Sequence, residues 1–227
     1  MALWLHVHGG YPSYAESGEQ WNQADWDAFN LVKALKGQNF NGYVKLQVRS
    51  GEWLTARAND RAPAFRLFGE WAALVLQELV RQQQVPAQGT LLVPVPSSSC
   101  IAFGTDEKGA ALAVAIAGKS PGFQAVNGLH WREAFGKAAE GGTRDAAILQ
   151  SNLVVADGPP SQIVLVDDVA TSGGHLLACA RALRARGHTV EHAICAAQTV
   201  WTHPENMWAI GSRDLEANPF ANAPLDF

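Results

Sequence analysis

Two carboxylates, two hydroxyl side chains and two glycines lie together in one short stretch of the chain. Asp167 and Asp168 follow a run of branched apolar residues, and the segment from Thr171 to Gly174 comes two residues later. A turn of such residues can aim several backbone N–H groups at one point, which is how a phosphate is held without Lys or Arg. The adjacent carboxylates suit hydroxyl groups or a hydrated metal ion. The stretch therefore predicts a phosphate site beside a site for hydroxyls or metal.

The residues on either side predict the elements that position this chemistry. Four branched apolar residues, from Ile163 to Val166, are typical of a strand that is buried on both faces. After the loop, apolar residues recur at helical spacing as far as Gly187. We therefore expect a strand, a phosphate loop and a helix in direct succession.

The segment from Val166 to Gly174 resembles the phosphoribosyl-pyrophosphate (PRPP) signature of type I phosphoribosyltransferases, in which two acidic residues precede a glycine loop rich in Thr and Ser. By this resemblance, Asp167 and Asp168 are the catalytic pair that holds the ribose hydroxyls, with Mg²⁺ bound through water or through those hydroxyls. The residues that the resemblance assigns to the 5′-phosphate are Ala170, Thr171, Ser172, Gly173, Gly174 and His175. His175 departs from the family, which usually has Thr or Ser there.

A second segment, Leu91 to Pro96, is similar to the strand before the pyrophosphate site of ComF-type phosphoribosyltransferases. This likeness assigns pyrophosphate binding to Pro96, Ser97, Ser98 and Ser99. An ordinary polar loop is an equally good interpretation of the three serines. Two departures from the ComF branch stand out: the loop is poor in Arg, with Lys108 as its first basic residue, and the usual N-terminal zinc ribbon is missing.

The family also has a flexible catalytic loop, which would here run from Arg132 to Arg144. This stretch is polar and contains glycine, so we expect a lid that excludes water during reaction. Lys137 and Arg144 are its candidate pyrophosphate contacts, although loop charges are more often simply solvated. Altogether, the resemblance covers Leu91 to Ala197 and leaves out the first ninety residues.

Composition sets wider limits. The chain has 227 residues, a formal net charge of −4 and a pI near 6.0, which predict no broad basic surface for nucleic acid or anionic membrane. Three cysteines without a C-x-x-C spacing argue against a disulfide framework and a zinc ribbon. No apolar run approaches the ~20 residues of a membrane span, and the N-terminus does not look like a signal peptide. We expect a cytoplasmic protein.

Hydrophobic periodicity outlines the rest of the chain. Strands that alternate with helices between Leu91 and Ala197 indicate an α/β fold, a Rossmann-type parallel sheet flanked by helices. The expected division is an N-terminal α+β extension and possible hood (1–62), a phosphoribosyltransferase core (63–200) and an irregular tail (201–227). The other elements expected are strands at Leu3–His8, Ala125–Trp131, Leu149–Ala156 and Thr189–Ala197, helices at Asp25–Lys36, Ala64–Gln84 and Lys108–Ala117, and a hairpin of Tyr43–Val48 with Trp53–Arg57.

These observations lead to two hypotheses about function. The first is a Mg²⁺-dependent transferase that moves phosphoribose from PRPP to a nucleobase or similar nitrogen acceptor, with a homodimer as a possible state. The second is a non-catalytic sensor that keeps the PRPP pocket for regulation. His6 and His8 share one strand face, but no further ligands cluster with them in the sequence, so we interpret them as structural or surface histidines.

Overall fold

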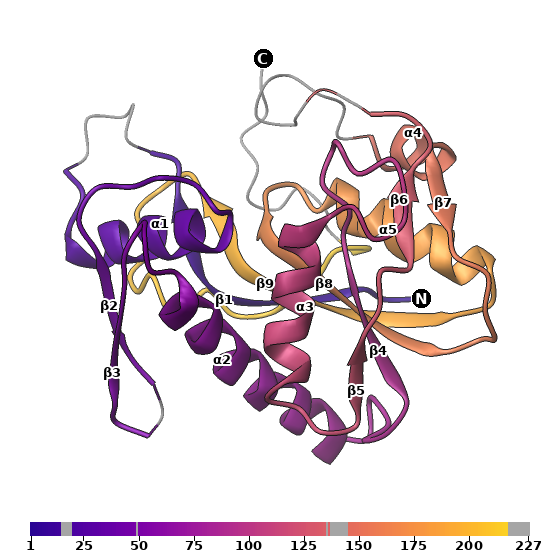
Figure 1. Cartoon of the computed structure of the whole chain (residues 1–227), viewed down its shortest axis with the longest axis horizontal. Helices are drawn as coiled ribbons and strands as arrows, with labels where there is room; N and C mark the ends of the chain where they lie inside the picture. The colour runs from indigo at the N-terminus through magenta and orange to yellow at the C-terminus, as the bar shows by residue number, and fades with distance from the viewer. Residues whose placement is uncertain (15–19, 49, 135, 137–144, 218–227) are drawn as a thin grey trace.

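The computed structural model describes residues 1–14, 20–48, 50–134, 136 and 145–217 (Figure 1). Its strands are β1 (Trp4–Pro12), β2 (Val44–Gln47), β3 (Trp53–Ala56), β4 (Thr90–Pro94), β5 (Phe123–Ala125), β6 (Leu129–Trp131), β7 (Leu153–Val155), β8 (Gln162–Ala170), β9 (Thr189–Val200) and β10 (Arg213–Asp214). Its helices are α1 (Gln23–Leu35), α2 (Ala62–Arg81), α3 (Glu107–Ala117), α4 (Ala146–Ser151) and α5 (Gly174–Ala185).

A six-stranded sheet in the order β10-β1-β9-β8-β4-β5 forms the centre of the described chain. All neighbouring strands in it are parallel except β10, which pairs with β1 in the antiparallel direction. Strand β8 lies inside this sheet, between β9 and β4, which explains its continuous apolar run. The fold is therefore α/β with a mainly parallel sheet, as the sequence predicted.

Helices cover both faces of the sheet. Side chains of α1, α2 and α3 pack with Val164, Val166 and Ile194 on one face. Side chains of α4 and α5 pack on the other face, with Ile163 and Leu165. The two hydrophobic clusters use alternate residues of β8, because successive side chains of a strand point to opposite faces.

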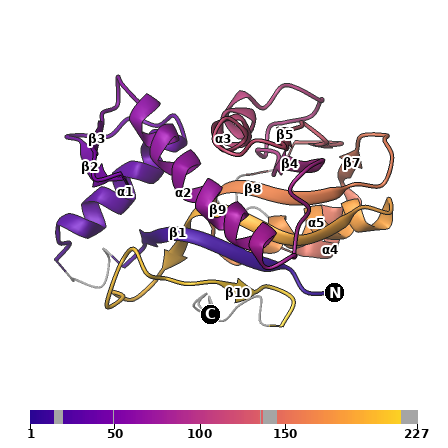
Figure 2. The same cartoon turned by 90° about the horizontal axis from the view of Figure 1, so that it is seen from below.

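Strand β1 belongs to the central sheet, although the expected division of the chain places it in an N-terminal extension. It is hydrogen-bonded to β9 from Trp4 to Pro12, and β10 from the expected irregular tail lies on its other side (Figure 2). The other boundaries of that division stay predictions. Gly9 and Gly10 lie within β1 where Trp208 and Met207 pack so closely that a Cβ would not fit.

Two strand predictions near the middle of the chain differ from the structure. The region Leu149–Ala156 is largely helical at its start, because the Asp145 side chain accepts hydrogen bonds from the amides of Ala147 (2.8 Å) and Ile148 (3.2 Å) and so begins α4. The single strand expected at Ala125–Trp131 is divided, with β5 in the central sheet and β6 paired antiparallel to β7. Short apolar runs do not distinguish these outcomes.

The remaining elements agree with expectation to within a few residues at their ends. β2 and β3 form the expected antiparallel hairpin, which in Figure 1 lies beside α1 on the flank of the molecule away from α4 and α5. β8 continues through Asp167 and Asp168 to Ala170, so the acidic pair is part of the strand. Among the described helices, none combines the length and the hydropathy that would let it cross a bilayer.

Candidate functional site

The two carboxylates of the acidic pair point to opposite faces of the sheet. They are consecutive residues of β8, and alternation along a strand separates their side chains. Asp168 faces α1 and α3, where it meets Lys36 and Lys108. Asp167 faces the phosphate loop and accepts a hydrogen bond from the Asp168 amide at 2.8 Å. That both carboxylates hold ribose hydroxyls stays a prediction, and the geometry gives them different surroundings.

Asp168 carries the densest set of charged contacts in this region. The Lys108 ammonium donates to its Oδ2 at 2.6 Å, and the Lys36 ammonium lies 3.7 Å from its Oδ1. The Asp168 side chain is only 7% exposed, whereas those of Lys36 and Lys108 are 26% and 35% exposed. Burial alone lowers the pKa of the Lys108 ammonium, but the adjacent carboxylates, Asp168 foremost, raise it above its ordinary value. Lys108 is therefore charged at neutral pH.

Asp167 lines a small cavity that the loop after β8 encloses. The cavity has a volume of about 80 Å³ and is otherwise formed by residues from Val169 to Leu176. That is room for one compact group, well below the roughly 300–1,000 Å³ of a site for a whole small molecule. Burial, together with the charge of Asp168, raises the pKa of Asp167 to about 7. A carboxyl group in this state can change its protonation near neutral pH.

The expected phosphate loop lies between β8 and α5, in the strand–loop–helix succession that the sequence predicted. Gly173 has φ of +84°, a left-handed conformation that favours glycine, and it precedes the first turn of α5. A Cβ there would lie 2.9 Å from Cδ2 of Leu215, so the loop is also packed tightly from the side of β10. The Thr171 hydroxyl is hydrogen-bonded to the Thr199 hydroxyl at 2.9 Å. The N-cap of α5, Gly173, has no side chain to cap the helix, and the Gly174 amide donates to the Ser172 hydroxyl at 3.4 Å. Residues from Gly173 to Leu176 line the cavity.

The expected pyrophosphate loop, Pro96 to Ser99, follows β4 at the same edge of the sheet. Its backbone is held by Asp106, the N-cap of α3, whose carboxylate accepts from the Ser97 amide at 2.6 Å and from the Gly109 amide at 3.0 Å. The Ser97 amide is therefore already engaged and is not a free donor for pyrophosphate. Among the described residues, no side chain bonds to the hydroxyls of Ser97, Ser98 or Ser99.

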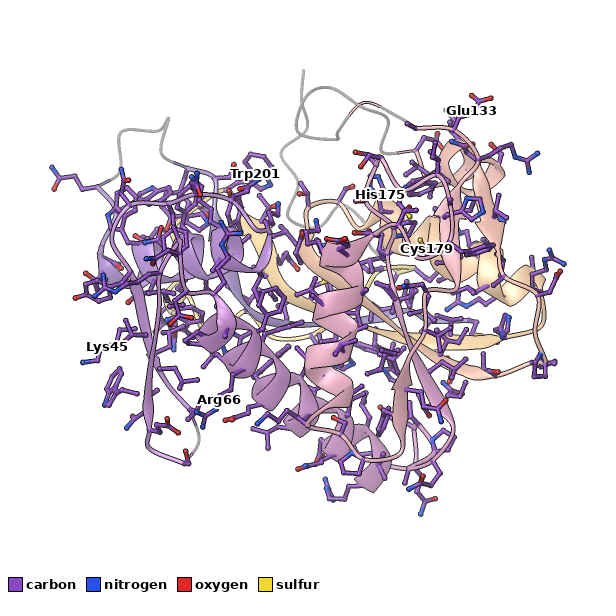
Figure 3. All side chains as sticks on the ribbon, viewed as in Figure 1. Lys45, Arg66, Glu133, His175, Cys179 and Trp201 are labelled. Carbon is purple, nitrogen blue, oxygen red and sulfur yellow. The ribbon has the colours of Figure 1, made fainter. Side chains whose placement is uncertain are left out.

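Trp131 connects the two loops. Its indole N–H donates to the carbonyl oxygens of Pro96 (3.1 Å) and Ser97 (3.0 Å), and its ring meets the His175 ring edge to face at 5.8 Å. Figure 3 shows His175 at the start of α5, one turn before Cys179. Trp131 is fully buried, so it fixes the distance between the loops after β4 and β8.

Several predicted residues lie together, and others are not described. The acidic pair, the phosphate loop and the serine loop all lie where parallel strands end, which is the edge at which α/β sheets bind ligands. Lys137 and Arg144 lie outside the described residues. Asn152 holds the start of the expected lid, since its side-chain amide donates to the Glu133 carbonyl at 2.9 Å and accepts from the Glu133 amide at 3.1 Å.

Sequence reasoning missed Lys36 as a site residue and gave Lys108 no role. Lys36 is the C-cap of α1, about 130 positions before Asp168 in the chain, in a region that the family resemblance does not cover. Lys108 is the first basic residue after the serine loop, which was its one available signal.

Aromatic side chains from β1 and α1 lie next to this charged cluster. Tyr11 stacks on Phe29 with ring centroids 5.4 Å apart, and the Lys36 ammonium lies 5.6 Å from the Tyr11 ring centroid. On β9, the buried Nε2 of Gln198 has no hydrogen-bond partner among the described residues, and the same holds for the buried Nε1 of Trp201, just beyond that strand (Figure 3). Buried donors without partners are uncommon in proteins, and here they lie at the ligand edge of the sheet.

The described residues do not fit a Mg²⁺ ion held by protein ligands alone. Both oxygens of Asp168 face ammonium groups, and Asp167 points to the other face of the sheet. In the part of the chain that the structure describes, no group of three or more His, Cys, Asp or Glu side chains is placed to hold a metal. A magnesium ion here would need oxygen ligands from the substrate, as Mg²⁺ sites often have.

His6 and His8 lie away from the candidate site. His6 contacts the His192 ring nitrogen at 3.2 Å and the Ser212 hydroxyl at 2.9 Å. His8 lies between the rings of Trp71 and Trp208. Burial lowers the pKa of both histidines to about 4, with the neighbouring His192 contributing at His6, so both are neutral at pH 7.

Among known proteins, the chain is similar in fold to several solved structures. No protein-family model matches the chain, and no curated protein matches it. An adenine phosphoribosyltransferase is 14% identical with a TM-score of 0.39, over 74% of this chain and 89% of its own. The orotate phosphoribosyltransferase of Mycobacterium tuberculosis is 17% identical with a TM-score of 0.28, over 77% and 83%. UMP synthase of Leishmania donovani is 13% identical with a TM-score of 0.29, over 75% of this chain but only 30% of its own. These are likenesses of fold and do not say which residues act.

Proposed function

We propose that this protein is a phosphoribosyltransferase that transfers phosphoribose from PRPP to a nitrogen acceptor. The observation that carries the proposal is the arrangement at the end of β8, where Asp167 and Asp168 are followed by the glycine loop and the start of α5. A phosphate in the small cavity at this loop would leave its sugar near the end of β8, where Asp168 presents its carboxylate on the side of α1 and α3. The sequence signature and the geometry support the same ligand.

In the proposed reaction, a bond forms between an acceptor nitrogen and the anomeric carbon of the ribose, while the bond from that carbon to the diphosphate oxygen breaks. The electron pair leaves with the diphosphate, and the acceptor nitrogen gives its proton to the diphosphate or to water. Positive charge develops on the sugar as the bond breaks. Carboxylates at Asp167 and Asp168 would stabilise that charge electrostatically.

A flat nitrogen heterocycle such as a nucleobase is the proposed acceptor. The stacked rings of Tyr11 and Phe29 and the unpaired donors of Gln198 and Trp201 support it, since together they offer an aromatic surface and hydrogen bonds to ring acceptors. We further propose that Mg²⁺ arrives with the diphosphate, because the protein residues alone do not hold it. A cytoplasmic location, a homodimer and a kinship with the ComF branch belong to the same proposal.

Isothermal titration calorimetry with ribose 5-phosphate and with PRPP, both with Mg²⁺, tests this function. The wild-type chain should bind both ligands, and Asp168→Asn should weaken binding at least tenfold because the carboxylate that accepts from ribose hydroxyls is lost. Asp157→Asn is the matched control, since the Asp157 side chain is 94% exposed and lies 3.6 Å from the Arg186 guanidinium. A wild-type chain that binds neither ligand would reject the proposal.

A second candidate is a PRPP or nucleotide sensor without turnover. His175 and the serine loop favour it, because the family's last loop hydroxyl is replaced and the expected pyrophosphate loop has no cation of its own. Pyrophosphate release from PRPP with a panel of nucleobases separates the two: release above the level of Asp168→Asn with any base excludes the sensor.

A further inference from the structure

The expected diphosphate site lacks positive charge where a diphosphate would need it. Residues from Pro96 to Ser99 are neutral, and the Ser97 amide already donates to Asp106. A diphosphate carries several negative charges, so hydroxyls alone would hold it weakly compared with charge-assisted hydrogen bonds. If the proposed function holds, a cation from elsewhere in the fold has to approach this loop.

Lys108 is fixed between the two loops. It is the second residue of α3, and the N-cap of that helix, Asp106, is bonded to the serine loop through the Ser97 amide. Its ammonium donates to Asp168 on β8 at 2.6 Å. A lysine in the first turn of a helix is unfavourable to the helix dipole, so the Asp168 carboxylate is what balances its charge in this position.

The ion pair occupies the carboxylate that the sugar would need. Asp168 is 7% exposed and has Lys108 on one oxygen and Lys36 on the other. Ribose hydroxyls would compete with the Lys108 ammonium for this carboxylate, because so little of the Asp168 side chain is open to another ligand. A displaced, largely desolvated ammonium in turn needs another anion close by.

We propose that the Lys108–Asp168 ion pair is exchanged when substrate binds: the sugar hydroxyls take the Asp168 carboxylate, and the Lys108 ammonium moves to the diphosphate. This inference rests on the proposed function and concerns the same site. Lys36 remains beside Asp168 and keeps its charge balanced during the exchange. Since either half of the substrate alone must break the ion pair without the compensating contact, the two halves should bind cooperatively, and the coupling is reciprocal.

Calorimetry with separate half-ligands tests the exchange on the full chain. Ribose 5-phosphate and inorganic pyrophosphate are titrated singly and together, with Mg²⁺ present. In the wild type, saturating pyrophosphate should tighten ribose 5-phosphate binding at least about fivefold, within the usual range for coupled sites. In Lys108→Met, pyrophosphate binding should fall at least tenfold, ribose 5-phosphate binding should be unchanged or tighter, and the coupling should disappear.

The opposite directions of these two changes are the decisive readout, because a merely structural role for Lys108 would weaken both ligands together. Lys108→Arg keeps a cation and should restore pyrophosphate binding, which also guards against a misfolded Met variant. Lys119→Met, which removes an ammonium 3.4 Å from Glu70 beyond the other end of α3, is the control. If Lys108→Met weakens both ligands equally, or neither, the exchange is wrong while the proposed function stands. If the wild type binds neither half-ligand, both fall.

Discussion

The two halves of the candidate site, here called the proposed phosphate half and the proposed diphosphate half, are built in different ways. The phosphate half is one continuous segment, from Asp167 to His175, in which strand, loop and helix follow each other directly. The diphosphate half is assembled from the loop after β4, the first turn of α3, the end of α1 and the buried Trp131. A local backbone conformation defines the first, whereas long-range contacts define the second. Mutations should therefore affect the two halves through different mechanisms.

The largest effect is expected at Trp131, which joins the halves. Trp131→Ala removes a fully buried ring and should lower the free energy of unfolding by about 3–5 kcal/mol in urea titrations. Trp131→Phe keeps an aromatic ring but loses the indole N–H that donates to Pro96 and Ser97, so it should cost only about 1–2 kcal/mol.

The Phe variant sharpens the comparison because it disturbs the diphosphate half selectively. Its pyrophosphate affinity should fall severalfold, while its ribose 5-phosphate affinity stays close to that of the wild type. Equal losses for both ligands would mean that the phosphate half also depends on this long-range contact.

A smaller effect is expected at Gly173. An alanine there has to adopt φ of +84°, which is unfavourable by about 1–2 kcal/mol, and its Cβ would press against Leu215. Ribose 5-phosphate binding by Gly173→Ala should fall at least tenfold, with pyrophosphate binding retained. Gly104→Ala is the matched control, because Gly104 has φ of +77° but nothing within 4 Å of the Cβ position. Similar losses in the two variants would show that backbone strain, rather than this packed loop, explains the result.

A pH-dependent effect on stability concerns the protonation of Asp167. Burial and the Asp168 charge raise its pKa from 3.8 to about 7 in the folded chain, so the folded state binds a proton more tightly than the unfolded state. The stabilisation from that proton is present at pH 4 and is lost as the pH rises through 7. Relative to wild type, Asp167→Asn should therefore be more stable at pH 8 than at pH 4, by on the order of a few kcal/mol, since each tenfold change in proton affinity corresponds to about 1.4 kcal/mol. Urea titrations at both pH values measure this difference, and a pH-independent difference would contradict it.

Much of the fold was predictable because periodic apolar patterns are local. The buried run from Ile163 to Val166 and the helical spacing after Gly174 predicted β8 and α5, and β4 and β9 followed in the same way. Errors occurred where the local pattern was short. The short apolar run at Leu149–Ala156 is compatible with either a strand or a helix. The N-cap at Asp145 begins α4, so the first residues of this run are helical.

The position of β1 was not predictable by the same reasoning. Its alternating pattern indicated a strand but carried no information about which strand would be its neighbour. The structure pairs it with β9, whose sequence begins almost 180 residues later. Pairing between distant strands depends on the packing of the whole sheet, for which a single segment has no signal.

The sequence by itself predicted the strand, loop and helix of the proposed phosphate half, because a buried apolar run, a glycine loop and apolar residues at helical spacing follow one another within one short segment. Only the tertiary structure decided the surroundings of the acidic pair. Because successive side chains of β8 point to opposite faces of the sheet, Asp167 faces the loop cavity and Asp168 faces the other side. The packing of α1 and α3 on that side places Lys36 and Lys108 next to the Asp168 carboxylate. Asp168 lies 60 positions after Lys108 and 132 positions after Lys36 in the sequence, so both ion pairs are products of the fold.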